Sequence, residues 1–201
     1  MTDERLIGPA NTADRAAIAR TLALAFQNDP VFRWMIPNDD FRRRRLPMLF
    51  DVFFDIELGR GLILASADVE AVSFWRSAGK AVTPFGDFLL RAWPMITNFA
   101  PSLLRMLAVS GAIEAHLPKD RPFWYAHFVG VSPDAQRMGW GAALVRAGLD
   151  RARADGLPVY LETARPENVR FYQALGFRVT GEWDVPGGPH FWSMLHAASP
   201  S

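Results

Sequence analysis

Residues 136–141 of this 201-residue chain read Gln-Arg-Met-Gly-Trp-Gly, between a β-prone run over 123–131 and a helix-like run over 142–154. Glycines let the backbone approach a ligand closely, and the first turn of a helix leaves N–H groups unpaired beside the positive end of its dipole. A strand, a glycine turn and a helix in this order predict a pyrophosphate site. The spacing is neither the three-glycine dinucleotide pattern nor a Walker loop, because no Gly-Lys-Ser/Thr follows.

The composition excludes several other kinds of chemistry. The chain carries 22 basic and 21 acidic side chains, so it lacks the basic excess typical of nucleic-acid-binding domains, and we expect no nucleic-acid partner. It has no cysteine, which excludes disulfides, cysteine-bound metals and a thiol nucleophile. Its four histidines show no spacing typical of metal ligands, so we expect no metal site.

Two segments bear on localisation. The first residues are acidic and lack the apolar stretch of a signal peptide. The most apolar stretch, 92–113, is interrupted by Pro94, Pro101 and Arg105, which a membrane span would not tolerate well. We therefore expect a cytoplasmic protein without a membrane partner, folded as a single domain over 1–201 and existing as a monomer or homodimer.

Hydrophobic periodicity and turn residues predict the elements that position the glycine loop. Apolar, β-prone runs predict strands over 6–10, 61–66, 70–76, 123–131, 159–163, 177–185 and 190–195. Helical stripes predict helices over 11–28, 31–36, 41–58, 84–113 (one or two), 142–154 and 166–175. The second half therefore reads β-α-β-α-β-β, which indicates an α/β or α+β fold with a mixed sheet.

The arginines at 42–45 form a basic run at the start of the expected long helix. Such a run is usually a solvated face, and the alternative is a contact to a cofactor phosphate.

Three ordered segments resemble the GNAT superfamily of acetyl-CoA-dependent N-acetyltransferases. The strand 128–131 and the loop 136–141 match the family's Q/R-x-x-G-x-G/A motif and the strand before it. The segment 168–177 matches its N-x-x-(F/A)-Y-x-x-x-G-F pattern. The resemblance covers about 122–197 well, and within it the run 161–177 is similar to the puromycin N-acetyltransferase-like subgroup.

This resemblance implies a fold and a division of labour. The fold would be a mixed, mostly antiparallel central sheet flanked by helices, with a helix-rich front half. The front half, about 1–121, would lie on the acceptor side, and about 122–197 would form the acetyl-CoA-binding core.

The resemblance also implies which residues bind acetyl-CoA. Backbone groups of Val129 and Val131 would bond the pantetheine arm, with Gly130 letting the arm lie close. Amides from Arg137 onward would hold the pyrophosphate. The cofactor-binding residues would be Phe128, Val129, Gly130, Val131, Gln136, Arg137, Met138, Gly139, Trp140, Gly141, Ala142, Asn168, Phe171 and Tyr172.

Acetyl transfer to an amine needs a proton acceptor and a proton donor. A primary amine has a pKa of about 10, so its ammonium form must lose a proton before attack. Glu162 and His127 are the leading candidates for the base. The alternatives are that Glu162 anchors the loop at Arg165 and that His127, which alternates with Tyr125 and Val129, is an ordinary half-buried histidine. Tyr172 is the candidate acid for the departing thiolate, unless it is a core tyrosine. The remaining candidates for the base are Asp29, Glu114, His116 and His190.

The acceptor side is rich in aromatic residues, most of them expected in the core. The puromycin enzymes carry a tyrosine where this chain carries Asp29, and an acid there would attract a cationic amine. The candidate acceptor-binding residues are Phe26, Asp29, Trp34, Trp75 and His190.

The sequence therefore predicts transfer of acetyl from acetyl-CoA to the primary amine of a small molecule, by direct attack in a ternary complex. A protein or peptide acetyltransferase is the first alternative. A non-catalytic acyl-CoA-binding domain is the second.

Overall fold

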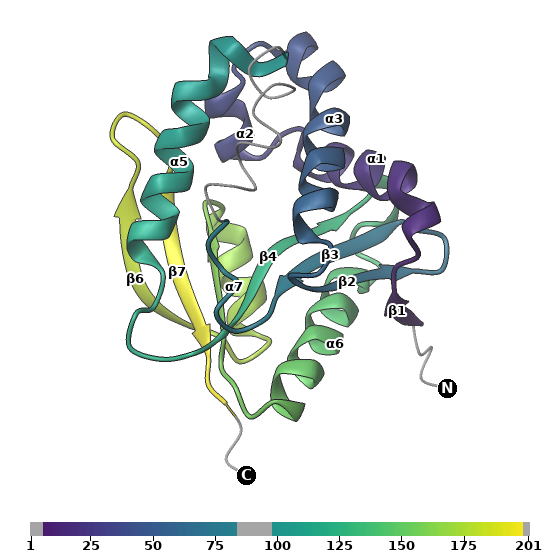
Figure 1. Cartoon of the computed structure of the whole chain (residues 1–201), viewed down its shortest axis with the longest axis vertical. Helices are drawn as coiled ribbons and strands as arrows, with labels where there is room; N and C mark the ends of the chain where they lie inside the picture. Colours follow the sequence, from purple (N-terminus) through teal and green to yellow (C-terminus); the bar gives the residue numbers. More distant parts are fainter. Residues whose placement is uncertain (1–5, 84–97, 199–201) are drawn as a thin grey trace.

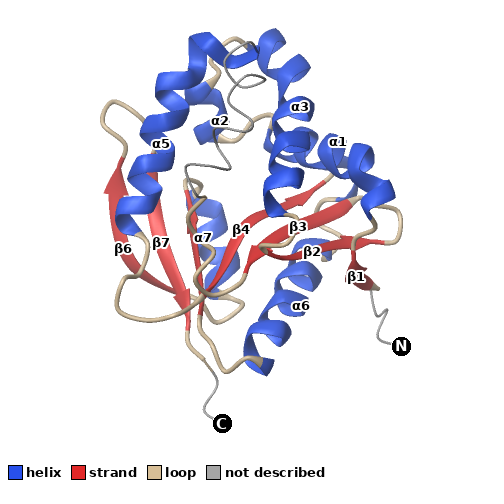
Figure 2. Ribbon diagram, viewed as in Figure 1, coloured by secondary structure: helices blue, strands red, loops and turns tan. Residues whose placement is uncertain are grey.

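The computed structural model describes residues 6–83 and 98–198. A seven-stranded sheet with the order β1-β2-β3-β4-β5-β7-β6 forms its centre, and helices cover both faces (Figures 1 and 2). The strands are β1 (Ile7–Pro9), β2 (Gly61–Ser66), β3 (Ala71–Arg76), β4 (Trp124–Val131), β5 (Val159–Thr163), β6 (Arg178–Asp184) and β7 (His190–His196). The helices are α1 (Arg15–Phe26), α2 (Pro30–Met35), α3 (Asp39–Glu57), α5 (Leu103–His116), α6 (Trp140–Ala154) and α7 (Pro166–Gln173), with 3-10 turns at Thr12–Asp14, Ala100–Ser102 and Pro133–Ala135.

The predicted strands and most of the predicted helices are confirmed, because local signals set their starts. The side chains of Asn11, Asp29 and Asn38 each accept a hydrogen bond from a backbone N–H two or three residues later. These caps begin the 3-10 turn before α1, then α2 and α3. Of the helices expected over 84–113, α5 accounts for the second half, and residues 84–97 lie outside the described residues.

The sheet is antiparallel except where β4 meets β5. These two strands run parallel and pair through only Trp124–Val159 and Tyr125–Tyr160. Beyond that point they part, since β4 stays paired with β3 and β5 stays paired with β7. The parting leaves two unpaired strand edges in the middle of the sheet.

A β-bulge lies in β4 at His127. Ala126 pairs with Trp75 and Phe128 pairs with Phe74, so His127 is an extra residue in β4. A bulge reverses the alternation of side chains after it. The expected alternation of His127 with Tyr125 is confirmed, because the two rings stack on one face of the sheet, but its extension to Val129 is wrong, and Val129 joins the core layer that contains Ala126.

Each face of the sheet has its own apolar layer. Helices α6 and α7 pack on one face, where Trp75 is fully buried against Gly148 of α6. Helices α1 and α3 pack on the other face, where an aromatic cluster surrounds Phe128. Together the two layers hold β4 in a fixed position between them.

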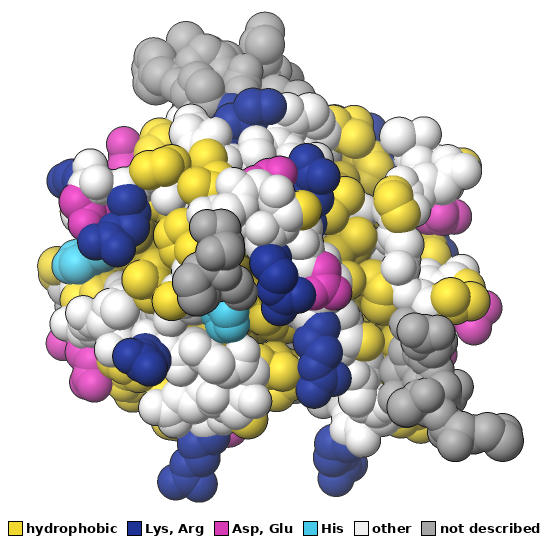
Figure 3. Space-filling view, turned by 90° about the horizontal axis from the view of Figure 1, so that it is seen from below, with side chains coloured by type: hydrophobic (Ala, Val, Ile, Leu, Met, Phe, Trp, Pro, Cys, Tyr) yellow, Lys and Arg dark blue, Asp and Glu magenta, His cyan; other side chains and the backbone are white. Residues whose placement is uncertain are grey.

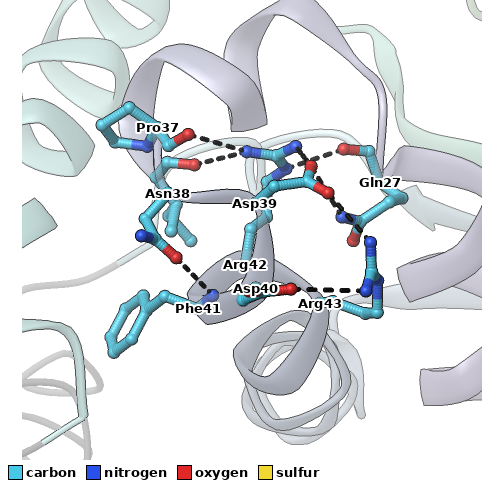
Figure 4. Close-up of polar contacts among 9 residues, drawn as sticks. Gln27, Pro37, Asn38, Asp39, Asp40, Phe41, Arg42 and Arg43 are labelled. Atoms are coloured by element: carbon cyan, nitrogen blue, oxygen red, sulfur yellow. Dashed lines mark hydrogen bonds and ion pairs between the residues drawn. The ribbon is translucent and has the colours of Figure 1, made fainter.

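Arg42 ties the ends of the first three helices together (Figure 4). Its side chain is buried and donates to the carbonyl oxygens of Gln27 and Ile36, both at 2.7 Å, and it pairs with Asp39. Arg42 is therefore neither part of a solvated face nor free to contact a cofactor phosphate, because its guanidinium donates to backbone carbonyls. This contact fixes the segment between α1 and α2 that carries Asp29.

The surface mixes charge signs. Acidic and basic side chains are interspersed with apolar ones on the face shown in Figure 3. Within residues 6–83 and 98–198, we find no helix with the length and apolar character needed to span a bilayer.

Candidate active site

The open edge of β4 offers backbone groups to a ligand. The amide of Ser132 donates to Glu70 beside β3, at 2.7 Å. Because neighbouring residues of a strand point their backbone groups to opposite sides, Val131 and Val129 direct theirs toward the gap before β5. The carbonyl of Val131 accepts one bond from the Gln136 side chain, at 3.2 Å. The backbone groups of the two valines that were predicted to bond the pantetheine arm thus point into the gap.

The loop before α6 is shaped as an anion site. Arg137 and Gly139 both have positive φ angles, of 63° and 86°, and Gly139 caps α6 without a side-chain bond. Within the described residues, the amides of Arg137, Met138, Gly139, Gly141 and Ala142 donate to no acceptor. Backbone amides in such a turn form a concave set of donors at the positive end of a helix dipole. A left-handed arginine costs free energy, which is typical of functional turns.

Helix α7 completes the cofactor side. The ring of Phe171 lies 3.5 Å from where a Cβ atom on Gly141 would stand, so α7 abuts the start of α6. The side chain of Asn168 donates to the hydroxyl of Thr163, at 3.4 Å, which places it at the end of β5. The predicted cofactor segments therefore converge around the gap.

Gly130 has a packing role in addition to the predicted one, which is to let the pantetheine arm lie close. A Cβ atom there would lie 2.7 Å from Leu22 and 3.1 Å from Ala25, both on α1. At these distances the side chains of α1 would have to shift, so the glycine lets α1 lie close to β4.

Glu162 is a carboxylate of the site whose surroundings raise its pKa. Tyr125 donates a hydrogen bond to its Oε1, and its Oε2 is buried without a partner in the described part of the chain. Burial raises the pKa of Glu162 to about 7, while the Tyr125 bond and the charge of Arg76 oppose that rise. A carboxylate with a pKa near neutrality and a free oxygen has the properties of a general base.

The three tyrosines of the chain gather around this carboxylate. Burial and the charge of Glu162 raise the pKa values of Tyr125, Tyr160 and Tyr172, so all three stay protonated. Tyr125, Tyr160 and Glu162 share the sheet face away from α6, whereas Tyr172 packs in the α6 layer. Glu162 and Tyr172 therefore approach the gap from opposite faces of the sheet.

His127 belongs to a buried ionic cluster. Arg76 donates from its Nε and one Nη to Glu57 on α3 in three hydrogen bonds, and the His127 Nδ1 donates to the same carboxylate at 2.9 Å. Burial and the charge of Arg76 lower the pKa of His127 to about 4. The pKa of Glu57 falls to about 2, because the bonds and charges of His127 and Arg76 outweigh its burial. An imidazole with so low a pKa has little affinity for a proton at neutral pH.

Three of the predicted acceptor residues lie on segments that border the end of β5. The Asp29 carboxylate is buried as the cap of α2, where burial raises its pKa and Arg165 at the end of β5 opposes the rise. The indole of Trp34 donates to Gly187 between β6 and β7, at 2.8 Å. His190, at the start of β7, bonds Asp184 at 2.9 Å.

The other two predicted acceptor residues are placed elsewhere. Trp75 lies in the α6 layer with its indole on Ser73, so its prediction as an acceptor contact is wrong. Phe26 packs edge to face on Phe128, with ring centroids 5.5 Å apart, as part of the aromatic cluster. The sequence missed Tyr125, Arg76 and Glu57, and the only signal for them was a set of polar residues inside apolar runs.

Helix α5 covers the front of the site. Its Arg105 donates to the backbone of Trp34 on α2, at 3.0 Å. At its other end His116 stacks on Trp183 of β6, with ring centroids 4.3 Å apart. The helix therefore spans from α2 to β6 above the sheet, as Figure 1 shows.

Comparisons with known proteins agree with this geometry. A family model described as Acetyltransferase (GNAT) family matches residues 85–177. An uncharacterized N-acetyltransferase of Schizosaccharomyces pombe is 25% identical over 174 residues, which cover 82% of this chain and 70% of the relative.

Solved structures share the fold. The structure of histone acetyltransferase HPA2 and related acetyltransferase from Corynebacterium glutamicum has a TM-score of 0.73 at 25% identity and covers 97% of both chains. A GNAT family acetyltransferase from Brucella melitensis, solved with acetyl-CoA, has a TM-score of 0.54 at 15% identity, covering 98% of this chain and 89% of the other. The match of residues 85–177 to the family model, together with the glycine loop, the parted strands and the shared fold, supports the GNAT family of acetyltransferases for this chain.

Proposed function

We propose that this acetyl-CoA-dependent acetyltransferase transfers the acetyl group to the primary amine of a small molecule, with Glu162 as general base. The observation that carries the proposal is the free, buried Oε2 of Glu162 beside the gap between β4 and β5. A group with a pKa of about 7 takes a proton from an ammonium and releases it to water near neutral pH. His127 is the weaker candidate, since its pKa is about 4 and its Nδ1 serves Glu57.

The proposed reaction is a direct attack within a ternary complex. The thioester lies in the gap, with its pantetheine arm along Val129 and Val131 and its diphosphate on the amides before α6. The amine enters from the face of α1, α3 and α5, gives its proton to Glu162 and attacks the carbonyl carbon. The amide of Val129 faces the gap and stabilises the resulting oxyanion. The C–N bond forms, the C–S bond breaks, and Tyr172 protonates the sulfur from the other face. The second proton lost by the amine nitrogen returns through water to Tyr172, and Glu162 releases the first proton to solvent.

The cover formed by α5 supports a small acceptor. Because this helix bridges α2 and β6 through Arg105 and His116, it closes the front face to an extended polypeptide. A buried carboxylate at Asp29 supports a cationic amine at the same end of the gap. We extend the proposal to the puromycin N-acetyltransferase-like subgroup on the strength of the run 161–177 alone.

The test measures release of free coenzyme A from acetyl-CoA over a panel of primary amines. A thiol reagent reports it without background from the protein, which has no cysteine. We expect turnover with at least one small amine, and a loss of about 100-fold or more in kcat for Glu162→Gln, with acetyl-CoA binding by calorimetry retained.

Three outcomes would contradict the proposal. Turnover of peptides alone would favour a protein acetyltransferase. Acetyl-CoA binding without turnover of any amine or peptide would favour a non-catalytic acyl-CoA-binding domain. Full activity of Glu162→Gln would remove the assigned base.

A further inference from the structure

The hydrogen bond between Tyr125 and Glu162 divides the two carboxylate oxygens into different environments. Oε1 accepts a hydrogen bond from the hydroxyl of Tyr125, and Oε2 is buried without a partner in the described residues. A buried carboxylate oxygen without a donor is costly. An amine proton arriving at Oε2 would satisfy it.

Tyr125 is itself held in place by its surroundings. The ring is fully buried, stacks on His127 with centroids 5.2 Å apart, and pairs across the sheet with Arg76 and Tyr160. It lies where β4 and β5 last pair, directly before the gap opens. The strand pairing therefore fixes the phenol relative to β5 and the carboxylate on it.

We propose that Tyr125 is a positioning residue for Glu162, holding the carboxylate through Oε1 so that Oε2 alone accepts the proton of the acceptor amine. The inference rests on the proposed role of Glu162 as base. It adds the residue that aims this base, which touches neither substrate nor cofactor.

The other charged groups around Glu162 do not take over this task. Arg76 of β3 donates three hydrogen bonds to Glu57 of α3. His127 of β4 donates to the same carboxylate. Tyr160 of β5 shares a hydrogen bond with Ser193 of β7, at 2.9 Å.

Tyr172 of α7 has no hydrogen-bond partner for its hydroxyl in the described part of the chain, and it lies on the far face. In this cluster the pKa of Glu57 is about 2, that of His127 about 4, and those of the tyrosines are raised. A titration near pH 7 within the cluster is therefore that of Glu162.

The chain offers a direct probe, because its three tyrosines all feel the charge of Glu162. Protein labelled with 3-fluorotyrosine gives one fluorine signal for each of Tyr125, Tyr160 and Tyr172, assigned by single Tyr→Phe variants. We expect an inflection near pH 7 in the wild type, strongest in the Tyr125 signal and absent in Glu162→Gln.

The decisive variant is Tyr125→Phe, read through the signal of Tyr172. The hydrogen bond from Tyr125 stabilises the charged form of Glu162. Its loss lowers the acid dissociation constant of Glu162 by about tenfold or more, so the inflection moves upward by about one pH unit. Tyr160→Phe is the matched control, since it removes a neighbouring phenol bonded to Ser193, and we expect a smaller movement. The acidic side of the pH profile of kcat, measured with an amine that the enzyme acetylates, should shift to higher pH by the same amount as the inflection.

The outcomes separate this inference from the function on which it rests. If no signal shows an inflection near pH 7, Glu162 is not a neutral-range base and the proposed function fails with it. If the inflection exists but Tyr125→Phe leaves it unmoved, or moves it no further than Tyr160→Phe does, only the role of Tyr125 is overturned. Should Tyr125→Phe not fold, a wild-type Tyr125 signal that responds less than that of Tyr172 would overturn it equally.

Discussion

Replacing Glu162 by glutamine should stabilise the protein at alkaline pH while abolishing the proposed base. The folded protein raises the pKa of this carboxyl from 4.5 to about 7, so the folded state holds the proton more tightly than the unfolded state. Stability from this group is therefore fully present below about pH 4.5 and is lost as the pH rises toward 7. Each pH unit of this difference corresponds to about 1.4 kcal/mol, so the ionised carboxylate costs the fold up to about 3 kcal/mol above pH 7.

The comparison of two pH values isolates this cost. At pH 5 most of the folded protein carries the proton on Glu162, and the cost is below about 1 kcal/mol. The advantage of Glu162→Gln over wild type in free energy of unfolding should therefore grow by about 2 kcal/mol between pH 5 and pH 8. Urea unfolding followed by circular dichroism measures it, with Glu114→Gln as the control at an exposed glutamate of α5.

The direction in which the stability advantage of Glu162→Gln changes with pH tests whether the pKa of Glu162 is raised. An advantage that is constant between the two pH values, or that shrinks as the pH rises, would refute the raised pKa of Glu162 and the reasoning from its burial. A growing advantage in Glu114→Gln as well would assign the effect to general charge.

Three further predictions concern other parts of the site. Tyr172→Phe should lower kcat by about 100-fold while leaving acetyl-CoA binding within about threefold of wild type, because only the departing thiolate needs its proton; an equal loss of binding would assign the tyrosine to cofactor contact instead. Glu57→Gln should reduce the free energy of unfolding by about 3–5 kcal/mol, since it leaves the buried Arg76 without its counter-charge, and urea unfolding would contradict this with a loss below about 1 kcal/mol. Gly130→Ala should cost about 1–3 kcal/mol, because the new methyl group meets Leu22 at 2.7 Å, and an unchanged unfolding midpoint would show that α1 moves freely.

The sequence predicted most of what depends on local patterns. The helices expected over 11–28, 31–36 and 41–58 and the glycine loop at 136–141 come from short-range patterns, and the structure bears out these elements. The predicted identity of Glu162 as a candidate base also came from its place on a strand beside the cofactor strand.

What the sequence missed depends on contacts between distant segments. The bulge at His127 exists only in the pairing of β4 with β3, so counting alternate residues along β4 alone gave the wrong face for Val129. The sequence suggests that Trp75 lines a pocket. In the structure its ring packs against Gly148 of α6, which is 73 positions away in the chain. Tyr125 gains its role from a carboxylate 37 positions along the chain.

The parting of β4 and β5 has a consequence for association with other polypeptides. A strand with unpaired backbone groups normally invites another chain to add to the sheet. Here the vacant edges lie at the centre, with four strands on one side, three on the other and helices above and below. A strand from another chain would have to pass between those helices to reach either edge. The protein thus carries unpaired strand edges without the exposure that promotes sheet pairing between chains.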